Sequence, residues 1–227
     1  MDQQKLWEQL QSGGHWGEVA FGPSRARYGY LTRIVGPACK VLNIGVGVGG
    51  LEERLFENGC DVFSIDPGVQ AIDQMREKFG SDDRFRVGEA ERIPFPDDEF
   101  DAVVMSEVLE HLGDDVLNHS VREVRRVLKP GGRFIGTVPA DEVLEINRCV
   151  CLHCGESFHR WGHQQSFSAE SLSTLLEAEF ANLRIERRHF SSRELLNWKG
   201  KFLRLLRIAA LAVGVHGSTD SFAFQAV

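Results

Sequence analysis

Residues 149–163, CVCLHCGESFHRWGH, place three cysteines and three histidines within fifteen positions. Thiolates and imidazoles are the ligands that structural zinc prefers, and a Cys-x-x-Cys-Gly turn followed by His-x3-His has the spacing of a tetrahedral zinc site. The sequence therefore predicts zinc bound by Cys151, Cys154, His159 and His163. Cys149 and His153 are spare ligands. The alternative is a set of reduced thiols and unconnected surface imidazoles.

A second group of side chains able to do chemistry lies in residues 106–112, SEVLEHL. If Glu107 begins a helical turn, Glu110 and His111 lie at i+3 and i+4 and share its face. Two carboxylates and an imidazole on one face can bind a divalent cation or supply a general base near neutral pH. The alternative is an ordinary role as a helix cap and a supporting hydrogen-bond partner.

A glycine-rich stretch, VLNIGVGVGG, contains Gly45, Gly47, Gly49 and Gly50. Glycines at such a place let the chain turn tightly and bring backbone amides against a ligand, which side chains would block. Asp66 ends the next strand, seventeen residues beyond Gly49, where a carboxylate can accept both ribose hydroxyls. The pair predicts an adenosine-type cofactor, but the glycines alone do not separate NAD from other adenosyl ligands.

Segments with strand and helix patterns alternate along the chain, which implies βαβ units and a parallel sheet. A helix is expected at 24–35, after a short amphipathic helix near the start of the chain. The later elements are expected at 40–45, 51–59, 61–66, 69–80, 84–88, 100–106, 115–128, 132–138, 168–180, 182–190, 198–213 and 221–227. Because ligands bind beyond the carboxyl ends of parallel strands, SEVLEHL and the cysteine-rich stretch should share the edge at which the cofactor binds.

The runs VGEAERIPFPDDEFDAVVMSEVLEHL and VREVRRVLKPGGRFIGTV closely resemble class I S-adenosylmethionine-dependent methyltransferases of the type 11 branch. The resemblance covers residues 38–138 strongly and 163–227 more weakly. It implies an α/β, Rossmann-like, doubly wound sheet of seven strands in the order 3-2-1-4-5-7-6, with the last strand antiparallel. We expect a single domain over 1–227, made of a helical N-terminal extension (1–36), a cofactor-binding half (37–139), a zinc-binding insertion after the fifth strand (140–167) and a C-terminal half (168–227).

The resemblance also implies roles for individual residues towards S-adenosylmethionine. Asp66 takes the ribose, Glu89 with Ala90 takes the adenine edge, and the methionine part of the cofactor is flanked by Gly45, Gly47 and Gly49. The chain departs from the family pattern in two places. Asn43 stands where the first motif usually opens with an acid, and Glu89 stands where the adenine contact is usually Asp.

SEVLEHL resembles, in addition, two groups of metal-assisted O-methyltransferases, those of ubiquinone biosynthesis and those that modify the 3′-terminal ribose of small RNAs. Both use a Glu-x-x-Glu-His series here, and the RNA group adds a histidine after the fifth strand. A second divalent cation at Glu107, Glu110 and His111 is therefore one expectation, and a simple acid, base or positioning role is the other. His163 can belong either to zinc or to the active site beside His111.

The chain has a formal net charge of −7, which weighs against a broad nucleic-acid-binding surface. Residues 184–207 carry eight basic side chains against two acids, so this segment can meet an anionic partner. Residues 198–215 can rest on a membrane surface, or form an ordinary helix between the last two strands. The start of the chain has no signal-peptide pattern and no apolar run reaches the length of a membrane span, so we expect a cytoplasmic protein. The oligomeric state stays open.

These observations favour a methyltransferase acting on oxygen of a small-molecule, glycan or lipid-linked acceptor. The rival enzyme is a metal-assisted 2′-O-methyltransferase of the RNA 3′-terminal ribose, which the acidic charge disfavours. A third alternative is a non-catalytic, zinc-stabilised binding protein, against which the intact glycines and Asp66 argue.

Overall fold

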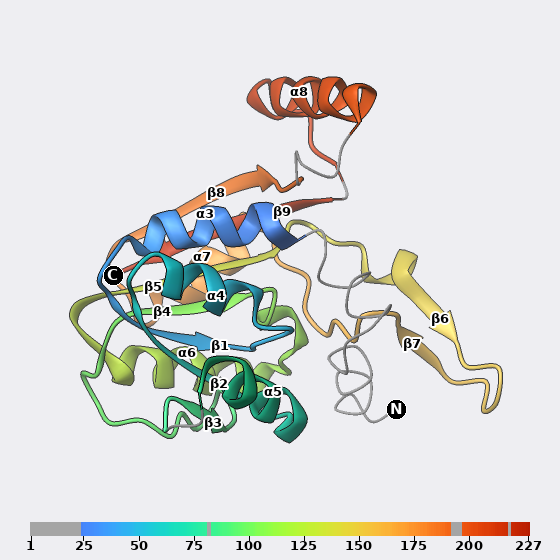
Figure 1. Ribbon diagram of the computed structural model, residues 1–227. Helices are drawn as coiled ribbons and strands as arrows, with labels where there is room; N and C mark the ends of the chain where they lie inside the picture. Colours follow the sequence, from blue (N-terminus) through green and yellow to red (C-terminus); the bar gives the residue numbers. More distant parts are fainter. Residues whose placement is uncertain (1–23, 81–82, 192–196, 218) are drawn as a thin grey trace.

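The computed structural model describes residues 24–80, 83–191, 197–217 and 219–227, and its centre is a seven-stranded sheet (Figure 1). The helix expected near the start of the chain lies outside these residues. The sheet strands are β1 (Lys40–Ile44), β2 (Asp61–Asp66), β3 (Phe85–Val87), β4 (Phe100–Ser106), β5 (Leu128–Pro139), β8 (Leu183–His189) and β9 (Asp220–Ala226).

The strands run in the order β3-β2-β1-β4-β5-β9-β8. The numbering departs from the expected 3-2-1-4-5-7-6 because two further short strands, β6 and β7, precede the last two and form a sheet of their own. The first five strands pair in parallel, whereas β9 is antiparallel to both β5 and β8, as expected. The carboxyl ends of β1, β2, β4 and β5 therefore meet at one edge of the sheet.

Helices cover both faces of this sheet. On one face, α3 (Arg25–Val35) and α4 (Gly50–Glu57) bury leucines and Val35 against β1, β2 and β4, and α5 (Val69–Phe79) packs against Phe85 of β3. On the other face lie α6 (Asp114–Val127) and α7 (Ala169–Glu177). The central strands are buried on both faces, which explains their continuous apolar sequences.

Two segments stand away from this body (Figure 1). The cysteine-rich stretch forms the antiparallel pair β6 (Arg148–Val150) and β7 (Ser157–His159), reached from β5 through the short 3-10 turn Leu144–Asn147. Another 3-10 turn, Leu109–His111, connects β4 to α6. The second segment is α8 (Trp198–Ala212), between β8 and β9. Within the described residues, no helix combines the length and apolar character needed to cross a membrane.

A buried carboxyl group lies beneath the sheet's first strand. Glu52 of α4 is fully buried, and its Oε1 accepts hydrogen bonds from Asn43 Nδ2 (2.7 Å) and Ser64 Oγ (3.0 Å). Burial raises the pKa of Glu52 to about 7, although both hydrogen bonds favour the charged form. The family's usual acid is missing at Asn43, and α4 supplies a carboxyl group to the same place.

The free energy of unfolding should carry the signature of this carboxyl. The folded chain keeps the Glu52 proton up to about pH 7 while the unfolded chain releases it near pH 4.5, so stability falls as pH rises between these values. Glu52→Gln removes this loss. Relative to wild type it should gain about 3 kcal/mol between pH 5 and pH 8 in urea unfolding experiments.

Glu53→Gln is the matched control, because its side chain is half exposed. The unpaired amide that the Glu52→Gln substitution introduces costs the same at every pH, so the difference between pH values isolates the carboxyl. Parallel stability profiles for Glu52→Gln and wild type would contradict the assignment.

Candidate active site

The glycine-rich loop between β1 and α4 needs its glycines for two reasons. Gly45, Gly47 and Gly49 have φ values of +86°, +54° and +76°, in the left-handed region that other residues rarely adopt. A Cβ at Gly45 would also lie 2.8 Å from Cγ2 of Val108. The loop therefore lies directly against the SEVLEHL segment.

Asp66, at the carboxyl end of β2, connects two loops of this edge. It is buried, and its Oδ2 accepts a hydrogen bond from the backbone N–H of Val46 (3.0 Å) while Oδ1 accepts one from Gly68 N–H (2.8 Å). The carboxylate thus fixes the glycine-rich loop relative to the start of α5. A ribose bound here would meet a carboxylate that is already oriented.

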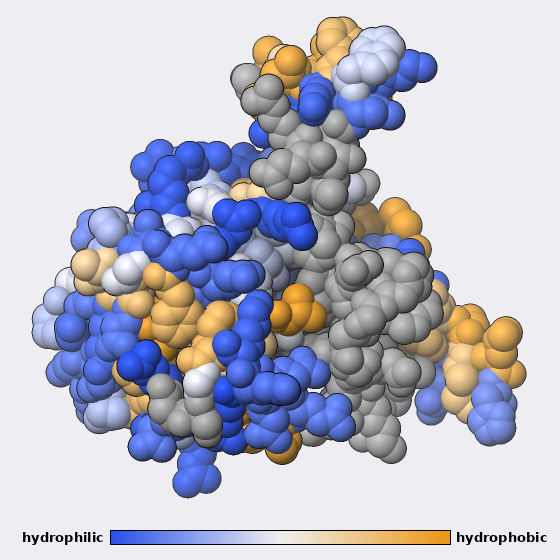
Figure 2. All heavy atoms as spheres, in the orientation of Figure 1, coloured by the Kyte–Doolittle hydropathy of each residue, from blue (hydrophilic) through white to orange (hydrophobic). Residues whose placement is uncertain are grey.

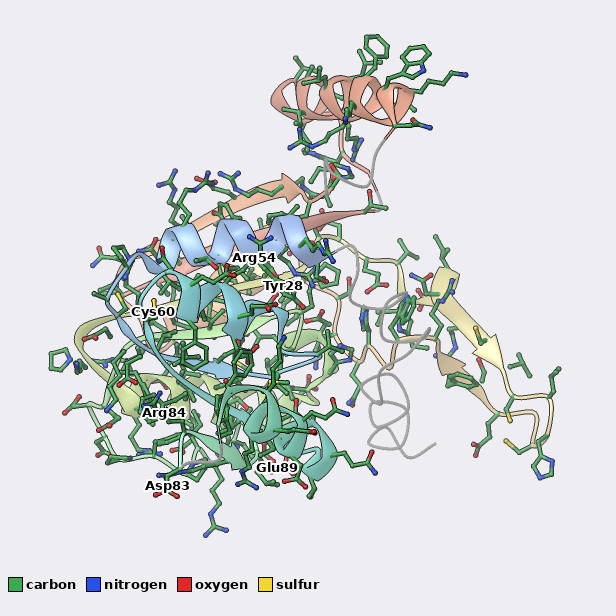
Figure 3. All side chains as sticks on the ribbon, viewed as in Figure 1. Tyr28, Arg54, Cys60, Asp83, Arg84 and Glu89 are labelled. Carbon is green, nitrogen blue, oxygen red and sulfur yellow. The ribbon has the colours of Figure 1, made fainter. Side chains whose placement is uncertain are left out.

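Glu89 and Ala90 follow β3, the next strand along the sheet. Ala90 is buried and Glu89 is exposed near the outer strands (Figure 3). Partial burial, then Glu91 and Asp66, raise the pKa of Glu89. Asp66 pairs with Val87 of β3, and Gly88 N–H donates to Asp66 O (3.2 Å), so the two carboxyl groups expected to hold ribose and adenine follow neighbouring strands at the same edge.

The SEVLEHL segment does not form the helical turn expected from Glu107. The N–H of Glu107 donates to Thr137 O (2.8 Å), which continues the pairing of β4 with β5, and Glu107 then takes a φ of +57°. A non-glycine residue in this region reverses the chain at some cost and is a frequent feature of functional sites. The 3-10 turn Leu109–His111 follows. The prediction that Glu107, Glu110 and His111 share a helical face is therefore wrong.

His163 takes the place that this prediction gave to Glu107. One ligand atom each of Glu110, His111 and His163 lie within 4.8 Å of one another, and the two imidazole rings meet edge to face with centroids 4.7 Å apart. The carbonyl oxygen of Glu110 accepts the N–H groups of Gln164 (2.7 Å) and Gln165 (3.0 Å), which carries His163 to this position.

The Glu110 side chain is the most unusual group of the site. The residue is 1 % exposed, and in the described part of the chain neither carboxyl oxygen has a hydrogen-bond partner. Burial, and then the nearby Glu107, raise the pKa of Glu110 well above its usual value. Such a carboxyl either holds a proton or balances a cation, and both are functions of an active site.

Both imidazoles of this group have a contact at Nδ1. His163 Nδ1 lies 2.5 Å from Glu142 Oε2, and His111 Nδ1 makes a long contact of 3.4 Å with Gly162 O, which can only accept. Burial raises the pKa of Glu142, but the hydrogen bond and charge of His163 outweigh it and leave the pKa low. Burial, and then His163, lower the pKa of His111 to about 3, so this imidazole is neutral.

The four residues predicted to bind zinc do not come together. Arg148 pairs with His159 and Val150 with Ser157, so Cys151 and Cys154 lie in the turn beyond the last pair, at the opposite end of the hairpin from His159. Among the described residues, no group of three close ligands includes a cysteine. Spacing alone favoured a tetrahedral site, but the pairing of β6 with β7 separates its halves.

His159 lies beside His163, and one ligand atom each of Glu142, His159 and His163 form a second close group. His159 Nδ1 accepts the backbone N–H of His163 (3.1 Å), so the neutral ring carries its proton on Nε2, 3.4 Å from Glu142 Oε1. The ring also stacks on His163, with centroids 4.6 Å apart. His159 therefore fixes the turn that delivers His163.

Sequence reasoning missed two residues that act on this site. Glu142 lies three residues after β5 and orients His163, and its place at the carboxyl edge was a usable signal. Arg27 of α3 donates from Nε to Ser106 Oγ (2.9 Å), and its Nη1 lies 3.8 Å from Glu107 Oε2. Nothing in the local sequence indicates Arg27, because its partners are about eighty residues away.

Known proteins resemble this chain in both sequence and fold. A family model described as a methyltransferase domain matches residues 42–136. An uncharacterized methyltransferase of Mycobacterium tuberculosis is 38% identical over 43% of this chain and 38% of its own length. The uncharacterized methyltransferase YcgJ of Bacillus subtilis is 34% identical over 59% of this chain and 57% of its own length. The sequence matches thus cover less than two thirds of the length of these relatives.

Solved structures extend the likeness across the fold. The YcgJ crystal structure superposes with a TM-score of 0.62 at 18% identity, covering 88% of this chain and 96% of YcgJ. The N-methyltransferase NodS of Bradyrhizobium japonicum, solved with S-adenosyl-L-homocysteine, has a TM-score of 0.66 at 18% identity, covering 100% of this chain and 98% of NodS. Residues 42–136 thus match the methyltransferase domain family, and the chain has the Rossmann-like fold seen in class I S-adenosylmethionine-dependent methyltransferases.

Cofactor binding should depend on Asp66. Asp66→Ala removes the acceptor of two loop amides and the carboxylate for the ribose, so we expect S-adenosylmethionine to bind at least about tenfold more weakly in calorimetry. Asp73→Ala on the exposed side of α5 is the control and should bind like wild type. Equal affinity in Asp66→Ala and wild type would remove Asp66 from the cofactor site.

Proposed function

We propose that the protein transfers the methyl group of S-adenosylmethionine to an oxygen atom of its acceptor. The observation that carries this proposal is the convergence of Glu110, His111 and His163 beside the glycine-rich loop. A sulfonium is already an activated methyl donor, so an enzyme mainly aligns donor and acceptor and excludes water. An acceptor hydroxyl additionally benefits from a group that removes or polarises its proton.

The cofactor is assigned to the loops after β1, β2 and β3. In this proposal Asp66 holds the ribose, Glu89 and Ala90 contact the adenine, and the methionine part lies along Gly45, Gly47 and Gly49. Asn43 acts indirectly, since its Nδ2 donates to Gly45 O (3.2 Å) and to Glu52. The side chain of Val108 lies against Gly45 and would then stand between the cofactor and the acceptor.

A divalent cation fits the acceptor side of the site. The donor set is a carboxylate and two imidazoles, and the two carboxyl oxygens of Glu110 are buried without hydrogen-bond partners among the described residues. Glu142 completes the arrangement, because a carboxylate that accepts the other N–H of a ligating histidine orients the ring and raises its basicity. A bound cation would act as a Lewis acid on the acceptor hydroxyl. Alternatively, one of the two imidazoles can accept the hydroxyl proton directly.

The acceptor class is a small molecule, a glycan or a lipid-linked intermediate. The placement of His163 beside Glu110 and His111 also favours, as a second candidate, the terminal ribose of RNA, because the resembling RNA enzymes have a histidine after the fifth strand. The net charge of −7 speaks against a long RNA surface. A zinc-stabilised binding protein loses its basis, because the cysteines and histidines lie apart.

Labelled methyl transfer tests the reaction. Wild type is incubated with methyl-labelled S-adenosylmethionine and, separately, with metabolite, glycan and lipid extracts and short RNA. We expect an O-methyl product in one non-RNA fraction, formed about a hundredfold more slowly by Glu110→Gln and His111→Ala. His119→Ala, an exposed histidine of α6, is the control. A product methylated on nitrogen or carbon, or unchanged rates in both variants, would contradict the proposal.

Metal binding is tested separately with Co²⁺ as the probe, titrated into chelator-treated protein and followed by absorbance. Glu110→Gln, His111→Ala and His163→Ala should each weaken binding at least about tenfold, and Glu142→Gln about tenfold through His163. Cys151→Ser should bind like wild type. Loss of binding in Cys151→Ser alone, with a thiolate absorbance band in wild type, would assign the metal to the cysteine-rich turn.

A further inference from the structure

Helix α8 is joined to the body by its cationic side. Residues at i, i+4, i+7 and i+11 share one helical face, and the four residues at these positions that are half-buried are Gly200, Arg204, Arg207 and Leu211. Arg207 Nη2 donates to Oδ2 of the buried Asp220 (2.7 Å), which also accepts the N–H of Gly217 (2.9 Å). The face with two arginines therefore points towards β9.

The apolar face of α8 points away from the protein. Large apolar side chains of the helix and its C-terminal end are between 42% and 78% exposed, and they are Trp198, Phe202, Leu203, Leu205, Leu206, Ile208, Val213 and Val215. In Figure 2 the orange, hydrophobic surface of α8 lies on the side of the helix remote from the sheet. An amphipathic helix that packs on its own domain has the opposite orientation. Within the described residues, this apolar face is therefore left uncovered.

Charges around the apolar face indicate which partner fits. Lys199 and Lys201 are exposed and border Trp198 and Phe202 on either side, and residues 198–213 contain no acid. Cations at a helix N-terminus oppose the helix dipole, so they add nothing to helix stability. Two copies meeting on this face would bring four lysines together, whereas anionic lipid headgroups would pair with them.

We propose that α8 docks in the headgroup region of an anionic membrane, with its axis in the membrane plane and its apolar face directed into the lipid. Aromatic and leucine side chains at the lipid boundary with lysines at the rim are the composition of such helices. The helix leaves the sheet between the end of β8 and the start of β9, where Ser221 pairs with Pro139 at the end of β5. Docking thus brings the carboxyl edge of the sheet near the membrane.

The test is flotation of the full chain with vesicles of phosphatidylcholine alone and of phosphatidylcholine mixed with phosphatidylglycerol. Wild type should float with the mixed vesicles and lose this binding as salt is raised. Phe202→Ser with Leu206→Ser should lower the partition coefficient at least about tenfold, as the removal of two exposed apolar side chains from lipid requires. Lys199→Glu with Lys201→Glu should weaken binding to the mixed vesicles.

The control is Val227→Ser, an exposed apolar residue outside α8, which should float like wild type. Neither acceptor nor S-adenosylmethionine is present, so the outcome is independent of the proposed reaction. Failure of wild type to bind the mixed vesicles, or equal binding by the Phe202→Ser and Leu206→Ser protein, overturns the proposal. It is equally overturned if wild type is a dimer in light scattering that this double variant converts to a monomer.

Discussion

The candidate active site depends on the hydrogen bonds that tie the chain after β7 to the loop after β4. The carbonyl oxygen of Glu110 accepts the N–H groups of Gln164 and Gln165, and the side chain of Gln164 donates to His111 O (2.6 Å). These bonds close a long excursion of the chain through the β6–β7 hairpin. Without them His163 would belong to a projecting hairpin and not to the sheet edge. A few backbone bonds thus convert two separate motifs into one site.

The sheet and the cofactor loops could be predicted because their signals are local. Apolar runs mark strands buried on both faces, and glycines mark left-handed backbone such as that of Gly45. The site beyond β4 was harder to predict. A spacing of i, i+3 and i+4 favours one helical face, but continued pairing with β5 holds the N–H of Glu107 and forces the reversal there. Tertiary pairing, which no local pattern reports, decided the position of that carboxyl.

The position of His163 likewise could not be predicted from local spacing. Metal-ligand spacing groups it with Cys151 and Cys154, whereas the register of β6 with β7 places the cysteines at the far end of the hairpin. Glu142 was missed because its role depends on a ring contributed twenty-one residues later. The amphipathic period of α8 was visible, but the direction of its apolar face was not, since that depends on the bond of Arg207 to Asp220.

Charge and hydrogen bonding differ between the side of the sheet edge assigned to the cofactor and the side assigned to the acceptor. Cofactor-side carboxylates such as Asp66 are satisfied by backbone amides, whereas Glu110 is buried without any partner, a costly state that a binding step would relieve. Arg27 lies near Glu107 and partly offsets its charge, so ionised Glu110 leaves the acceptor side negative. A divalent cation there would offset this negative charge, which would stabilise an acceptor oxygen as it loses its proton. In the proposed reaction the methyl donor is itself a cation, so the divalent cation would be separated from it by Val108, on the side to which the hairpin delivers His163.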